Sequence, residues 1–64
     1  MVTVNGEKKE WSGKTVEEML QSSGYQKERV AVELNEEILP KTQYAETILK
    51  TGDCVEVIEF VGGG

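Results

Sequence analysis

The sequence has no histidine and only one cysteine, Cys54. Without imidazole the chain lacks the usual general base and the commonest ligand of transition metals. A single cysteine excludes an internal disulfide and a Cys₂His₂-type zinc site. The Walker and dinucleotide-binding glycine fingerprints are missing too. The chain therefore lacks the side chains of a self-contained enzyme, and we expect no metal site and no bound cofactor.

Long apolar runs and excess positive charge are also missing. No stretch approaches the ~20 apolar residues that span a bilayer, and the N-terminus lacks the features of a signal peptide. The net charge is −5, from 12 acidic and 7 basic residues. This balance disfavours nucleic acid and anionic membranes as partners, while it suits either solubility or a partner with a basic face. We expect a cytoplasmic protein.

The 64 residues of the chain have the pattern of one small α+β domain. A domain of this size buries about 60% of its unfolded surface, so it has little room for an enclosed active site. Residues 2–5 alternate apolar and polar, and Asn5-Gly6 is a strong hairpin signal. We expect a strand, a tight turn and a charged return strand through Lys8 to Trp11, with Trp11 on the core or its rim.

A short helix follows the hairpin. Thr15 and Glu18 have the spacing of a capping box, so Glu17-Glu18 indicates a helix start rather than a catalytic carboxylate pair. Gly24 is the expected stop. One helical face is apolar, formed by Val16, Met19 and Leu20.

The rest of the chain alternates short strands and turns. Residues 30–34 predict a strand, and residues 38–39 predict a brief one that Pro40 ends. The polar Asn35-Glu36-Glu37 between them indicates a solvated turn rather than a metal site. After Pro40, residues 41–46 predict a helical turn that packs Tyr44 against the core.

The last strand follows a turn at residues 50–53. Its alternation puts Val55 and Val57 on the helix side and Ile58 and Phe60 on the opposite face. The element order predicts a mixed sheet of four to five strands under one main helix, with the last strand central and parallel to the first. This is a β-grasp arrangement, although the pattern alone leaves other α+β layouts open.

Two features of this strand bear on function. Ile58, Phe60 and Val61 are candidates for docking a partner; the alternative is that the exposed apolar side chains cap the edge of the core. Cys54 has no histidine to lower the pKa of its thiol, so we expect a small structural hydrophobe.

The sequence ends in Gly62, Gly63 and Gly64. Glycine has no side chain to bury and loses the most entropy when it is ordered, so the glycines predict a flexible tail. The chain would then consist of a domain at residues 1–61 and a tail at residues 62–64. The terminal carboxylate of Gly64 becomes the candidate reactive group.

Several segments, in their order and at this chain length, resemble the ThiS family of sulfur carrier proteins of thiamine biosynthesis. The terminal diglycine is shared with all ubiquitin-like carriers, whereas the segment at residues 30–40 points to ThiS among them. This chain departs from the family in having a third glycine, which leaves Gly63-Gly64 as the matching pair. The resemblance rests on residues 2–6, 15–20, 30–40, 52–53 and 59–64.

The resemblance implies a ubiquitin-like β-grasp fold and a protein cosubstrate rather than an enzyme. It implies that a ThiF-type enzyme uses ATP to adenylate the carboxylate of Gly64. Sulfur, from a cysteine desulfurase or another donor, would replace the AMP, and the thiocarboxylate would supply thiazole synthase of the ThiG type. Gly62 and Gly63 would pass through a narrow channel in each partner, and we expect a monomer when the carrier is free.

Three other functions stay open at this point. The small subunit of molybdopterin synthase shares the fold and the tail. A β-grasp interaction module could carry the glycines as an unstructured end. A protein modifier could be conjugated through Gly64 to lysines. Thiocarboxylate formation, the product formed and isopeptide adducts distinguish these hypotheses.

Overall fold

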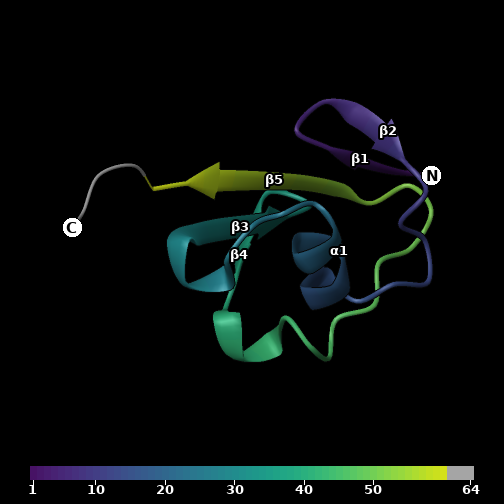
Figure 1. Cartoon of the computed structure of the whole chain (residues 1–64). Helices are drawn as coiled ribbons and strands as arrows, with labels where there is room; N and C mark the ends of the chain where they lie inside the picture. Colours follow the sequence, from purple (N-terminus) through teal and green to yellow (C-terminus); the bar gives the residue numbers. More distant parts are fainter. Residues whose placement is uncertain (61–64) are drawn as a thin grey trace.

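A computed structural model describes residues 1–60 of the chain. Its five-stranded mixed sheet has the strand order β2-β1-β5-β3-β4, and the helix α1 packs against one face (Figure 1). The predicted fold class is therefore confirmed. The elements are β1 (Val2–Val4), β2 (Glu7–Lys9), α1 (Val16–Ser22), β3 (Val30–Leu34), β4 (Glu37–Leu39) and β5 (Cys54–Glu59), with single 3₁₀ turns at Lys27–Arg29 and Lys41–Gln43.

β5 is the central strand. It pairs in parallel with β1 at two positions, Thr3 with Cys54 and Val4 with Val55. On its other side it pairs antiparallel with β3 at five positions, from Val30–Glu59 to Leu34–Val55. The prediction of a central last strand parallel to the first is confirmed. Because β1 is much shorter than β5, the two sides of β5 are paired to different extents.

The first hairpin turns at Asn5 and Gly6, with φ angles of 51° and 84°. Both central residues of this tight turn lie in the left-handed region, which asparagine and glycine adopt most readily. The return strand β2 ends at Lys9, opposite Val2, so the predicted extension to Trp11 is wrong. The strand stops there because β1 offers no further residue to pair with. Trp11 lies beyond it and packs, partly buried, against the core as expected.

The helix begins and ends where the sequence indicates. The Thr15 N–H donates to Glu18 Oε1 at 2.8 Å, and the Glu18 N–H donates to Thr15 Oγ1 at 3.0 Å. This capping box also holds the pKa of the Glu18 carboxyl below its usual value, because the backbone and side chain of Thr15 hydrogen-bond to it. Gly24 follows the last turn at a φ of 84°. In residues 1–60 no helix is long and apolar enough to cross a membrane.

The core lies between α1 and the sheet. Tyr44 is fully buried in it, as predicted, although its hydroxyl has no hydrogen-bond partner among the described residues. Burial raises the pKa of this phenol, and the nearby backbone of Val32 offsets part of the increase. The other buried core residues are Val2, Val16, Met19, Leu20, Val30, Val32, Leu49, Val55 and Val57.

Candidate functional site

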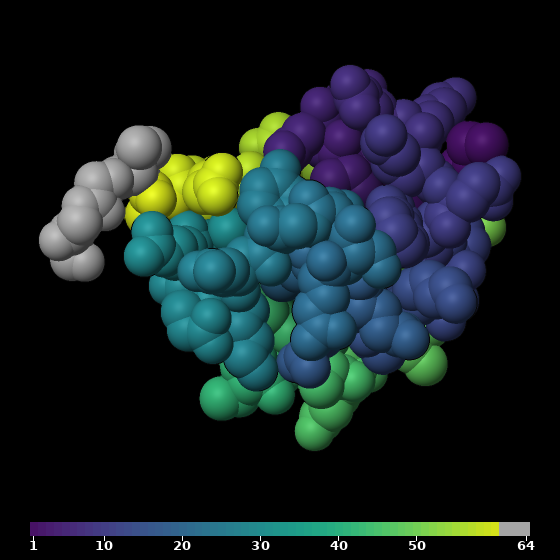
Figure 2. Space-filling view, viewed as in Figure 1, coloured from purple at the N-terminus to yellow at the C-terminus, as the bar shows by residue number. Residues whose placement is uncertain are grey.

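The candidate site lies at the C-terminal end of β5. Figure 1 shows this strand extending beyond β1 and β2, and Figure 2 shows its last residues, in yellow, at one extremity of the molecule. Phe60 is the last described residue. The candidate residues Val61, Gly62, Gly63 and Gly64, and the boundary drawn after residue 61, lie outside the described residues, so these assignments stay predictions.

The predicted alternation along β5 is confirmed. Val55 and Val57 are buried under α1, while Ile58 and Phe60 are 46% and 57% exposed. Ile58 lies on the face of the sheet that α1 does not cover, opposite Ala31 of β3. Ile58 and Phe60 therefore place apolar surface at the C-terminal end of β5, in agreement with the docking hypothesis.

The same face carries acidic side chains around Cys54. Glu33, Glu36, Cys54 and Glu56 line a shallow hollow of about 240 Å³. Cys54 is exposed, so the expectation of a packed structural residue is wrong. The reason is the alternation of β5, which turns Cys54 to the same open face as Glu56 and Ile58. The face thus combines negative charge with an apolar end, a combination that suits a partner with basic side chains.

Two asparagine side chains bind the backbone of β5. The Val57 N–H donates to Asn5 Oδ1 at 2.8 Å, and Asn5 Nδ2 donates to the Val57 carbonyl at 3.4 Å. Near the start of the strand, the Cys54 N–H donates to Asn35 Oδ1 at 2.9 Å, and Asn35 Nδ2 donates to Asp53 Oδ1 at 3.1 Å. The sequence indicated only turns at both asparagines. Their bonds to β5 could have been suspected because each asparagine directly follows a strand that is shorter than β5 and pairs with it.

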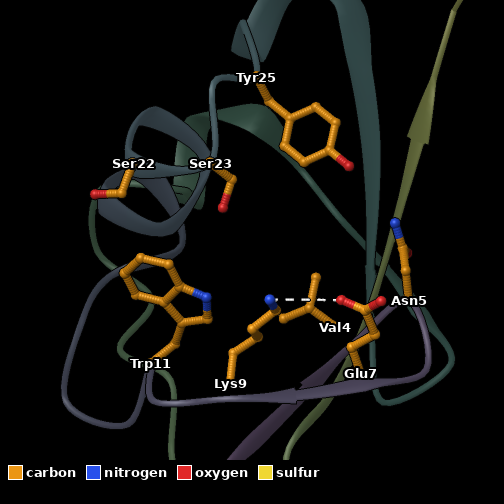
Figure 3. A pocket seen from close by; sticks show the side chains of 8 residues that line it. All are labelled: Val4, Asn5, Glu7, Lys9, Trp11, Ser22, Ser23 and Tyr25. Carbon is orange, nitrogen blue, oxygen red and sulfur yellow. Dashed lines mark ion pairs between the residues drawn. The ribbon is translucent and has the colours of Figure 1, made fainter.

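A second hollow, of about 410 Å³, lies between the first hairpin and the end of α1 (Figure 3). Glu7 Oε1 and Lys9 Nζ form an exposed ion pair of 3.5 Å at one side of it. Across residues 1–60 no group of three or more acidic, cysteine or histidine side chains could hold a metal ion. The residues lining this hollow are Val4, Asn5, Glu7, Lys9, Trp11, Ser22, Ser23 and Tyr25.

Comparison with known proteins identifies the family. The ThiS family model matches residues 2–64. The chain belongs to the ThiS family. It is 41% identical over 64 residues to the sulfur carrier protein ThiS of Thermus thermophilus and 36% identical over 66 residues to that of Bacillus subtilis, and in each case the match covers 100% of both chains.

A solved ThiS structure has the same fold. The crystal structure of the thiamine biosynthesis protein ThiS from Geobacter metallireducens superposes with a TM-score of 0.77 at 40% sequence identity. The match covers 98% of this chain and 97% of that one. The ubiquitin-like β-grasp fold implied by the resemblance is confirmed.

Thiazole synthases are also similar to this chain over part of their length. The chain is 42% identical over 64 residues to the thiazole synthase of Paramagnetospirillum magneticum, where it spans 20% of that protein. It is 38% identical over 53 residues to the thiazole synthase of Magnetococcus marinus and spans 16% of it. These larger proteins therefore contain a ThiS-like region.

Proposed function

We propose that this ThiS family member carries sulfur as a thiocarboxylate on the terminal carboxyl of Gly64. The sulfur-carrier function in thiamine biosynthesis follows from family membership. A small carrier of this kind is a protein cosubstrate and not a catalyst. The observation that carries the proposal is the full-length match to ThiS proteins together with the terminal Gly63-Gly64.

The chemistry needs groups that partner enzymes can supply. A carboxylate is a poor electrophile because it is negatively charged and has no good leaving group. In the proposed cycle a ThiF-type enzyme transfers AMP from ATP to the Gly64 carboxylate and releases pyrophosphate. A persulfide sulfur then attacks the acyl carbon and AMP leaves, and a thiol cleaves the resulting acyl disulfide to free the thiocarboxylate.

The tail suits this exchange. If extended, the four residues after Phe60 would span roughly 13 Å, which is enough to reach into a buried active site. Glycines at positions 62–64 have no Cβ to clash with the walls of a narrow channel. The proposal therefore gives Gly62 and Gly63 a threading role and makes Gly64 the reacting residue.

Docking is assigned to the open face of the sheet. Ile58 and Phe60, with Val61, would contact the partner, and the acidic side chains around Cys54 would meet basic ones. Two observations support this surface: no helix covers it within residues 1–60, and it includes the end of β5 that directly precedes the tail in sequence. Apolar anchors beside a charged rim are typical of protein interfaces.

We further propose that the partners are a ThiF-type activating enzyme and a thiazole synthase of the ThiG type. A ThiS-like region within larger thiazole synthases supports the second partner. The sulfur would come from a cysteine desulfurase or another donor, and the chain itself would bind no cofactor. We place this cycle in the cytoplasm and expect the free carrier to be a monomer.

A reconstituted reaction tests the proposal. The chain is incubated with ATP, a ThiF-type enzyme, a sulfur donor, thiazole synthase and the carbon substrates of that enzyme, and thiazole is measured by mass spectrometry. We expect thiazole to form only when the chain is present. Molybdopterin formation with the large subunit of molybdopterin synthase, and no thiazole, would support the alternative function and contradict this one.

A further inference from the structure

Asn5 extends the pairing of β5 by one residue beyond the end of β1. The Asn5 N–H donates to the Val55 carbonyl at 2.9 Å, as the next residue of a parallel strand would. The backbone then turns away at Asn5, with a φ of 51°, and enters β2. The carboxamide of its side chain, with an acceptor and a donor like a peptide group, accepts a hydrogen bond from the Val57 N–H and donates one to the Val57 C=O. A side chain thus replaces the missing strand residue.

Beyond Val57 the two sides of β5 differ. On the β3 side the pairing continues, because the Phe60 N–H donates to the Arg29 carbonyl at 2.8 Å. On the β1 side neither the strand register nor any backbone hydrogen bond reaches Glu59 within residues 1–60. Among the described residues, Asn5 therefore makes the last hydrogen bonds to the backbone of β5 on that side, before Ile58, Phe60 and the tail.

We infer that Asn5 is a positioning residue for delivery of the C-terminal carboxylate. It would act through its hydrogen bonds to Val57. By holding Val57 on the β1 side, while β3 holds the other side, it fixes the direction of residues 58–60 at the end of β5 and thus presents Ile58 and Phe60 in one arrangement to the activating enzyme. This role rests on the function proposed above.

Loss of this contact has a defined consequence. The end of β5 would keep its partners on the β3 side alone and would open more often, as strand ends do when backbone hydrogen bonds are lost. The activating enzyme would then have to order residues 58–60 during docking. The free energy needed to order these residues weakens formation of the complex. KM for the carrier therefore rises, while kcat of the bound complex changes little.

Asn35 provides a matched control within the same strand. It too lies in the left-handed region, at a φ of 52°, and its side chain binds β5, but at the end remote from the tail. Glycine adopts such φ values without strain, so Asn5→Gly and Asn35→Gly each remove a side-chain contact and preserve the turn. Asn5→Asp keeps the acceptor for the Val57 N–H and tests partial rescue.

The test compares these variants in adenylation by a ThiF-type enzyme. For Asn5→Gly we expect KM for the carrier to rise about ten-fold, as befits the loss of two hydrogen bonds, with kcat within about two-fold of native. Asn35→Gly keeps a near-native KM, and Asn5→Asp lies between native and Asn5→Gly. Amide hydrogen exchange at Val57 becomes faster in Asn5→Gly and not in Asn35→Gly.

The outcomes separate this role from general stability and from the proposed function. An unchanged KM in Asn5→Gly, or an equal rise in both glycine variants, overturns the role of Asn5. If the native chain is not adenylated at all, the proposed function fails first, and the positioning role fails with it. Urea unfolding of the two glycine variants checks that their losses of stability are comparable.

Discussion

At the scale of single residues, the ring and the hydroxyl of Tyr44 have opposite effects on stability. Its ring fills the core, but its hydroxyl is buried without a hydrogen-bond partner in residues 1–60. A buried polar group without a partner costs about 1–3 kcal/mol. The ring therefore stabilises the fold, whereas the hydroxyl opposes it.

Tyr44→Phe keeps the ring and removes the hydroxyl. We expect the free energy of unfolding at neutral pH, measured by urea denaturation, to rise by about 1 kcal/mol. Because burial raises the pKa of Tyr44 in the folded state, the native chain also loses stability above about pH 10, where the unfolded chain ionises first. Tyr44→Phe should not show this loss of stability at alkaline pH. A fall of about 1 kcal/mol at neutral pH would show that the hydroxyl is hydrogen-bonded in solution.

Burial and exposure along the last strand were predictable because they follow from periodicity. Alternation along the last strand correctly separated buried Val55 and Val57 from exposed Ile58 and Phe60. The same alternation applied to Cys54, but its residue type suggested packing, and the structure exposes it. The contact of Asn5 with Val57 spans 52 positions in sequence, so no local pattern indicates it.

At the scale of elements, β5 combines a stabilising face and a presenting face. The side toward α1 holds the core, whereas the open side carries Ile58 and Phe60 next to the tail. Substitution on the open side should therefore affect binding more than folding, since exposed positions contribute little to stability.

Ile58→Asp tests this division. We expect the Kd for the activating enzyme, measured by calorimetry, to rise at least about ten-fold, because an apolar anchor of the proposed interface becomes a charge. Ile48→Asp is the control, since Ile48 is 57% exposed but lies outside β5, at an isolated bridge with Thr15. Equal affinities of both variants would remove Ile58 from the interface.

Element boundaries were less predictable than element types. The capping box and Gly24 marked the helix because their signals are local. The end of β2 was misplaced because strand length depends on the partner, and the three residues of β1 allow only three pairs. Strand ends are therefore set by pairing between distant segments rather than by local composition.

At the scale of the whole molecule, the fold brings the last strand into the centre of the sheet. β1 and β3 flank β5, so the last strand of the described chain lies inside the sheet and not at an edge. Element order predicted this topology, but resemblance to a family was needed to choose the β-grasp fold among α+β layouts. The roles of residues 61–64 come from sequence alone.

The central claim is that the carboxylate of Gly64 becomes a thiocarboxylate. The most direct measurement is the intact mass of the chain after incubation with ATP, a ThiF-type enzyme and a sulfur source, beside a truncated variant that lacks Gly62, Gly63 and Gly64. We predict that the mass of the native chain shifts by the replacement of one oxygen by one sulfur. The mass of the truncated variant stays unchanged. No mass change in the native chain, under conditions that convert another ThiS protein, would contradict the claim.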